Sequence, residues 1–171
     1  MPDVIASGPL SRPFALAAEL LAASATFQAL VSAADATEAL DSIDYPYRDL
    51  EAGDYLIPGG YLFDDESLDQ FRDWSGKEGG QLGLVLSAAK SVTHATDSKN
   101  DLKEWRNTLG AILAEMLTLS KTPAAGGGFH WNLTGWRKVS IGWQQKSEDA
   151  LDADPTVEKT FRIGLFILNW V

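Results

Sequence analysis

The sequence predicts an α+β fold, in which two principal helices pack on one face of a mainly antiparallel sheet. Two long segments carry apolar residues at the three- and four-residue spacing of amphipathic helices. Other segments alternate between apolar and polar residues with a period of two, which is typical of strands. The chain has 171 residues, of which 45 % are hydrophobic, so one domain can bury its own core. We expect a flexible arm over residues 1–10 and a single domain over residues 11–171.

The first helix is expected over residues 14–31, and it should end near Ala33. Ser11 suits the N-cap position, and Pro13 suits the first turn. The apolar stripe of this helix consists of Phe14, Ala17, Leu20, Leu21, Ser24, Phe27, Leu30 and Val31. Polar residues interrupt the segment and no cationic stretch precedes it, so we expect neither a membrane span nor an export signal.

A short helical turn over Ala36–Leu40, capped by Asp35, leads into a region of extended segments. Ile43, Tyr45 and Tyr47 alternate there with other residues, as in a strand. The Pro-Gly-Gly sequence at residues 58–60 predicts a turn between two extended segments that are rich in aromatic residues. Residues 64–74 fit either a single exposed helix or the tip of a long loop.

The next strand is expected over residues 81–92, with three leucines on one face and Val85 on the other. A second helix opens near Ser98 and shows the clearest helical periodicity of the chain. Its stripe consists of Leu102, Trp105, Leu109, Ile112, Leu113, Met116 and Leu117. Pro123 and the glycines at residues 126–128 end this helix.

An antiparallel pair of strands is expected to complete the sheet. The first covers residues 129–143, and an acidic hairpin connection over residues 147–155 leads to the second, over residues 157–171. In the final strand the odd-numbered positions are apolar nearly throughout. The even-numbered positions begin polar and turn apolar at Phe166, Leu168 and Trp170. We therefore expect this strand to be fully paired and covered, either by the protein's own core or by another copy of it.

The formal net charge of −10 at pH 7 argues against a nucleic-acid-binding surface, because phosphate contacts need Lys and Arg. The sequence contains no cysteine, so it offers neither a disulfide framework nor a thiolate zinc site. Two acidic clusters do not match a calcium-binding loop. They consist of Asp64, Asp65, Glu66 and Asp69, and of Glu148, Asp149, Asp152 and Asp154. We interpret both as hydrated surface, which could also pair with basic residues of a partner subunit.

Motifs for catalysis are few. His94 and His130 have no carboxylate at ligand spacing beside them, so we interpret them as loop-edge or partly buried histidines. The glycines at residues 126–128 follow a helix and lack the Lys-Ser/Thr pair, unlike a P-loop. The Gly-Xaa-Ser-Xaa-Gly elbow of hydrolases is absent. We therefore predict no catalytic site, no cofactor and no metal site.

The 6 tryptophans are the unusual feature of the composition. Trp105 belongs to the stripe of the second helix, so we assign it to the core. Trp131, Trp136 and Trp170 fit either a core or an interface, because aromatic residues are enriched at the centres of interfaces. With Phe166 of the final strand, these three tryptophans are the candidate interface residues.

The order of elements resembles the tail-terminator, or tail-completion, proteins in the neck of long-tailed bacteriophages. The segments that carry the resemblance are FALAAELLAASATFQ (residues 14–28), YPYR (45–48), GLVLS (83–87), LGAILAEM (109–116) and FRIGLFI (161–167). It covers most of the chain from about residue 12 onward. Residues 64–80 and 126–136 have no matching family motif.

The resemblance implies a structural virion protein that is made in the host cytoplasm and works in the phage neck. It would form a ring, expected to be hexameric, that caps the tail tube. Its partners would be other copies of itself, the tail tube protein and the head-completion or connector proteins. DNA would only pass through the channel, and no membrane, cofactor or enzymatic activity is implied.

Two alternatives remain open at this point. The first is another neck component, such as a head-closure adaptor, although head-closure folds lean towards small β-barrels. The second is a monomeric acidic enzyme or small-ligand-binding domain, in which His130, Trp131 and Asp64 would line a pocket. The oligomeric state separates the ring from the monomer.

Overall fold

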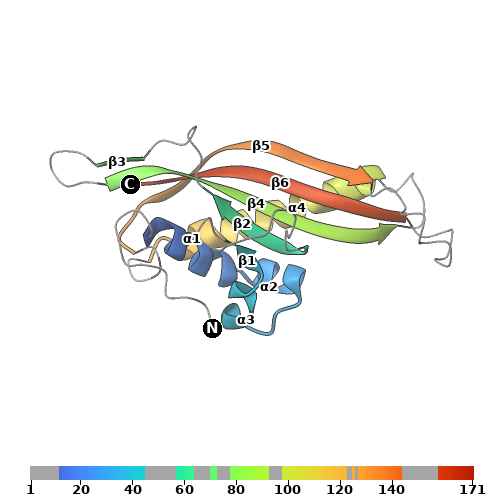
Figure 1. Ribbon diagram of the computed structural model, residues 1–171, viewed down its shortest axis with the longest axis horizontal. Coiled ribbons are helices and arrows are strands. Elements are labelled where there is room, and N and C mark those ends of the chain that lie inside the picture. Colours follow the sequence, from blue (N-terminus) through green and yellow to red (C-terminus); the bar gives the residue numbers. More distant parts are fainter. Residues whose placement is uncertain are drawn as a thin grey trace.

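The computed structural model in Figure 1 describes residues 12–44, 57–63, 70–72, 78–92, 98–122, 125, 127–143 and 158–171. In chain order their elements are α1 (Arg12–Ala22), α2 (Ala25–Val31), α3 (Ala36–Leu40), β1 (Ile43–Asp44), β2 (Gly59–Phe63), β3 (Gln70–Arg72), β4 (Glu78–Val92), α4 (Ser98–Leu119), β5 (Trp131–Trp143) and β6 (Glu158–Trp170). The arm at residues 1–10 and the acidic connection at residues 147–155 lie outside the described residues.

The strands form one 6-stranded sheet in the order β1-β2-β4-β6-β5, with β3 also paired to β4. The pair β1 and β2 is parallel, and every other pair is antiparallel. Strand β6 is central: it pairs with β4 from Glu158 to Trp170 and with β5 from Thr160 to Trp170. The predicted α+β fold is confirmed, and so is the prediction that the last strand is paired on both sides.

Both principal helices lie on the same face of the sheet, as predicted (Figure 1). Gly60, Leu86 and Gly164 are partners in one row across β2, β4 and β6, so they share a face. A Cβ atom at Gly60 would lie 2.8 Å from Cδ2 of Leu21 on α1. A Cβ atom at Gly164 would lie 2.7 Å from Cδ1 of Leu109 on α4. The missing side chains therefore let the two helices approach the sheet closely.

The core fills the space between this face and the helices. Strand β6 shows a strict alternation, in which the even-numbered residues from Arg162 to Trp170 are buried and the odd-numbered ones are partly exposed. In β4 the three leucines of the predicted inner face are fully buried, and Val85 lies partly exposed. The predicted stripe of the second helix is also buried at Trp105, Leu109, Ile112, Leu113 and Met116. Hydrophobic burial on this scale is the main force that stabilises such a domain.

The first predicted helix is wrong in its continuity, because the chain breaks it into α1 and α2, which meet at an angle of 79°. Ser24, assigned to the apolar stripe, is instead the N-cap of α2 and accepts a hydrogen bond from the backbone N–H of Phe27. Helix α2 ends at Ser32, whose backbone takes the left-handed conformation. Among the described helices none is long and apolar enough to cross a membrane alone, while the bent pair α1–α2 meets that test by length and composition.

Two further local predictions are corrected. Gly59 and Gly60 belong to β2 and do not form a turn, because the absent side chain of Gly60 makes room for Leu21. Within residues 64–74, which were expected to be a helix or a loop tip, the described part is the strand β3. It pairs with β4 from Gln70 opposite Gly80 to Arg72 opposite Glu78, so hydrogen bonds to a neighbouring strand decide its form. The short helix α3 with Asp35 as its N-cap is confirmed.

Candidate assembly surface

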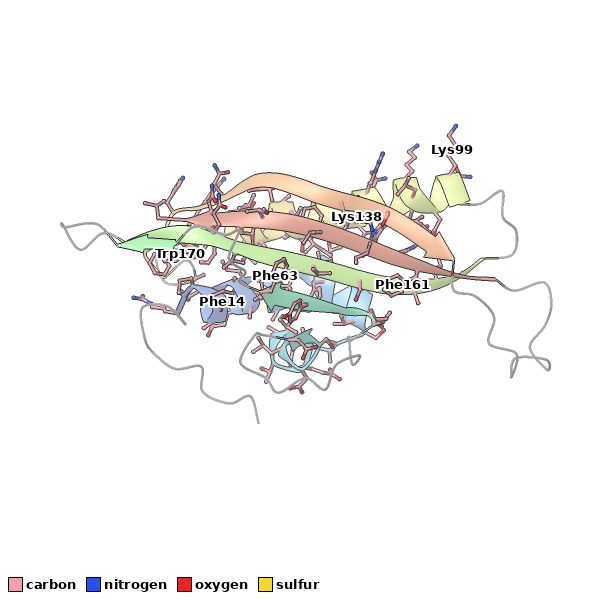
Figure 2. The ribbon with its side chains drawn as sticks, turned by 45° about the horizontal axis from the view of Figure 1, so that its top comes forward. Phe14, Phe63, Lys99, Lys138, Phe161 and Trp170 are labelled. Carbon is pink, nitrogen blue, oxygen red and sulfur yellow. The ribbon has the colours of Figure 1, made fainter. Side chains whose placement is uncertain are left out.

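The face of the sheet that points away from α1 and α4 carries a set of apolar side chains that are not fully buried. We call it the open sheet face and define it by Tyr61, Phe63, Val85, Ala89, Phe161, Ile163, Leu165 and Ile167. These residues are partly exposed, except Ala89, which is exposed. Phe63 and Phe161 lie at different positions along the strands in Figure 2. Antiparallel sheets that face water on one side normally carry polar residues there, so this face departs from the usual pattern.

The side chains of β6 form a ridge along this face. Phe161, Ile163 and Leu165 follow one another at every second position and are all partly exposed. Their neighbours on β4 are Ala89, Ser87 and Val85, and their neighbours on β5 are Gly142, Ser140 and Lys138. Most of these neighbours are small. The large apolar side chains of β6 therefore stand above what flanks them and are available for contact with another surface.

Aromatic residues of β2 form one margin of the open sheet face. The rings of Tyr61 and Phe63 are stacked, with centroids 5.7 Å apart and planes 10° from parallel. The ring of Phe63 lies directly over Gly83 of β4, where a Cβ atom would overlap it. A flat aromatic surface therefore lies on the same face as the ridge, with β4 between them, and aromatic residues are common in the centres of protein interfaces.

Strand β5 is an edge of the sheet and runs for 13 residues. Long edge strands expose backbone N–H and C=O groups that another chain can pair with. Two irregularities interrupt the pairing of β5 with β6, between Leu133 and Gly135 and between Trp136 and Lys138. Such bulges twist an edge and limit continued pairing along it. The open sheet face is therefore a more extensive contact surface than the edge of β5.

The structure places three of the four candidate interface residues in the protein's own core. The exposed fractions are 7 % for Trp131, 3 % for Phe166 and 2 % for Trp170. Phe129 covers both tryptophans, with ring centroids 6.2 Å from Trp131 and 5.0 Å from Trp170. Of the two interpretations left open by the sequence, the core therefore applies to these side chains. Trp136 is the strand partner of Phe166, and its side chain lies outside the described residues.

The sequence reasoning recognised the other apolar half of β6 but did not nominate it as an interface. The signal was present, because both alternating sets of this strand are apolar near its end. A strand with two apolar faces needs two covering layers. The helices supply one layer, over Phe166 and Trp170, and the residues that remain are Phe161, Ile163 and Leu165.

A charged cluster, in which Arg162 and Asp101 are buried and Lys90 and Glu104 lie nearer the surface, joins the start of α4 to the sheet. Arg162 of β6 forms an ion pair with Asp101 and lies 3.4 Å from the carboxylate of Glu104. Lys90 of β4 pairs with Glu104 and lies 3.7 Å from Asp101. The guanidinium also lies over the ring of Trp105, 5.8 Å from its centroid. Burial lowers the pKa of Arg162 from its ordinary value, because desolvation disfavours the charged form.

A groove of about 550 Å³ lies between α4 and the sheet. Its lining is mostly apolar and includes Gly110, Leu113, Leu133, Val139 and Phe166, with Arg106 contributing the cation. His130, proposed for a small-molecule pocket, is exposed at the start of β5, and its backbone exchanges hydrogen bonds with Val171. His94 and Asp64 lie outside the described residues. Among residues that the structure describes, no group of three or more His, Asp or Glu side chains could hold a metal ion.

The arrangement offers chemistry for association. The open sheet face can bury apolar surface, the β5 edge can donate and accept backbone hydrogen bonds, and the groove beside α4 combines an apolar lining with a cation. Comparison with models of protein families and with curated proteins gives no match for this chain.

Proposed function

We propose that the chain is a structural virion protein of a long-tailed bacteriophage, a tail-terminator subunit. Its copies form a ring, expected to be hexameric, that caps the tail tube. The ring joins the tube protein to the head-completion or connector proteins of the neck. The protein acts by binding and carries out no catalysis. It assembles in the host cytoplasm and then remains in the virion.

The observation that carries this proposal is the open sheet face. Phe161, Ile163 and Leu165 stay partly exposed along a strand that is otherwise central to the fold. Each large apolar side chain that passes from partial exposure to full burial contributes on the order of 1 kcal/mol. A face of this length therefore favours association with a partner surface, and a subunit of a ring needs such surfaces on both neighbours.

The net charge of −10 supports the same function. A neck ring surrounds a channel through which DNA leaves the head. Acidic side chains around that channel repel the phosphates and keep the DNA from adhering. DNA is therefore cargo that passes through the ring and is not bound by it.

A head-closure adaptor of the same neck is the second candidate, since it would use the same apolar face. The architecture favours the terminator, because the described strands form an open-edged sheet with helices on one face and not a small barrel. An enzyme with a pocket at His130 is less well supported, since this residue does not line the groove.

The test is the assembly state of the purified full chain. Light scattering and electron microscopy, with and without purified tail tubes, should show rings that seat on the tube ends. Leu165→Glu places a charge on the ridge and should abolish ring formation. Ala29→Glu, at an exposed position of α2 away from the sheet, should leave the rings intact. A chain that stays monomeric at micromolar concentration in the presence of tail tubes contradicts the proposal.

A further inference from the structure

We infer that the exposed cations of α4 and the groove between α4 and the sheet form a docking site for the acidic segment 148–154 of a second copy of this chain. The inference deepens the proposed function, because it names a contact between neighbouring subunits and rests on their self-assembly. It assigns a partner to the exposed cations at the start of α4 and uses the acidic cluster of residues 148–154 by its sequence alone.

Lys99, Lys103 and Arg106 form a basic stripe along α4. Their spacing of four and three residues places them on one side of the helix. All three are exposed, and Lys99 projects away from the sheet in Figure 2. Among the described residues none of the three makes an ion pair. The stripe therefore presents three uncompensated positive charges on a chain whose net charge is −10.

This placement of cations does not stabilise α4. The N-terminal end of a helix carries partial positive charge, so Lys99 and Lys103 oppose the helix dipole. The acidic residues of the same turns, Asp101 and Glu104, are engaged with Arg162 and Lys90 of the sheet. The first turns of α4 therefore bury Asp101 against the sheet and leave Lys99 and Lys103 exposed. An anionic partner on the outer side removes the unfavourable interaction.

The apolar groove continues the basic stripe. Arg106 belongs to both, and Gly110 lies one turn further along the helix. A Cβ atom at Gly110 would meet no other atom within 4 Å, so the groove is open at this point. Beyond it the lining is apolar, with Leu113, Leu133 and Val139. The site thus fits a segment that presents several carboxylates beside an aliphatic side chain.

Residues 148–154 have this chemistry in their sequence, Glu-Asp-Ala-Leu-Asp-Ala-Asp. The carboxylates match the stripe in sign, and Leu151 matches the groove in polarity. They lie outside the described residues, so the match uses their sequence alone. Because two copies of an acidic chain repel each other, their association is favoured where acids of one copy meet cations of the other. A contact between segment 148–154 of one copy and α4 of the next can repeat head to tail, and such a heterologous contact is the type that closes a ring.

The experiment is a charge exchange between two variants of the full chain. The first is Lys103→Glu with Arg106→Glu, and the second is Asp149→Lys with Asp152→Lys. Each variant alone should need a concentration on the order of tenfold higher for half-assembly, as judged by light scattering at low salt. Mixed in equal amounts, they should assemble near the concentration that suffices for the wild type. Lys121→Glu, exposed near the other end of α4, is the matched control and should behave as the wild type.

Three outcomes overturn the inference. If both variants alone form rings at the wild-type concentration, the contact does not exist, while the proposed ring function stands. If the mixture fails but one chain with all four changes assembles, the segment meets its own helix and not that of a second copy. If the wild type forms no ring under any condition, with tail tubes included, the proposed function fails together with the inference.

A peptide of residues 146–156 gives a readout that does not depend on ring formation. It should bind the Asp149→Lys, Asp152→Lys variant and should bind the Lys103→Glu, Arg106→Glu variant at least tenfold more weakly. The same peptide with Leu151→Gly should lose part of the affinity if the groove receives Leu151. Equal binding of both peptides, with the charge effect retained, would assign the stripe to acidic partners in general and contradict the specific pairing.

Discussion

Glu115 of α4 accepts a hydrogen bond of 2.7 Å from the hydroxyl of Ser24, the residue that caps α2. The same carboxylate accepts the backbone N–H of Thr26 at 3.0 Å and also its hydroxyl. One acidic side chain thus satisfies donors at the first turn of a helix that is far away in sequence. This contact explains why the chain bends between α1 and α2.

Stability should therefore depend on pH through Glu115. Burial raises the pKa of this carboxyl, but the hydrogen bonds from Ser24 and Thr26 outweigh it, and the pKa is lowered from its ordinary value of 4.5. A carboxyl with a lowered folded-state pKa stabilises the fold above its unfolded-state pKa, and that contribution is lost as the pH falls through the folded value. Glu115→Gln should cost about 2 kcal/mol in urea unfolding at pH 7, and progressively less as the pH falls through the lowered pKa of Glu115. A pH-independent difference between the two proteins would contradict this.

The break at Ser24 shows where local sequence reasoning reaches its limit. The apolar spacing of residues 14–31 runs across Ser24 without a change of phase, so the periodicity alone does not mark the break. Ser24 caps α2 through the hydrogen bond from Phe27, and the partner of its hydroxyl is Glu115, which is 91 residues away. The strand β6 and the helix α4 were predictable from the sequence. The alternation in β6 extends over about six residue pairs, and the apolar stripe of α4 extends over more than three helical turns. Elements whose form depends on one distant contact were not.

Which face of β6 the helices cover also depends on contacts between distant parts of the chain. Both sets of alternating residues are apolar, so the period alone did not say which set the helices cover. The helices occupy the face that carries Gly164 and Gly60, where the absent side chains leave room for Leu109 and Leu21. This is why Trp131 and Trp170 belong to the core and the odd-numbered residues do not.

Close packing at Gly164 can be tested with a matched pair of glycines. In Gly164→Ala the new Cβ atom would lie 2.7 Å from Leu109 and 2.9 Å from Phe166, so the side chains must shift. We expect a loss of about 1–3 kcal/mol in the free energy of unfolding. Gly110→Ala, in an exposed part of α4 with no atom within 4 Å of the new Cβ, should instead stabilise by up to about 1 kcal/mol. If both variants unfold at the same urea concentration, α4 does not press on the sheet at this point.

The buried pair of Arg162 and Asp101 should show strong coupling. Arg162→Leu leaves the carboxylate of Asp101 buried without its principal cation, and we expect a loss of about 3–5 kcal/mol. Asp101→Asn with Arg162→Leu removes both charges and should recover a large part of this loss. A double-mutant cycle by urea unfolding measures the coupling. Additive effects of the two substitutions would show that the pair does not anchor α4 to β6.

The open sheet face makes a prediction about stability as well as assembly. Leu165 and Leu168 belong to the same strand, but Leu165 is partly exposed and Leu168 is 1 % exposed. In the unassembled chain, Leu168→Ala should cost about 2–5 kcal/mol, because it leaves a cavity against the helices. Leu165→Ala should cost about 1 kcal/mol or less and act mainly by weakening association. Equal losses in the free energy of unfolding would mean that another part of the chain covers Leu165, and the ridge on β6 would then not be available to a partner.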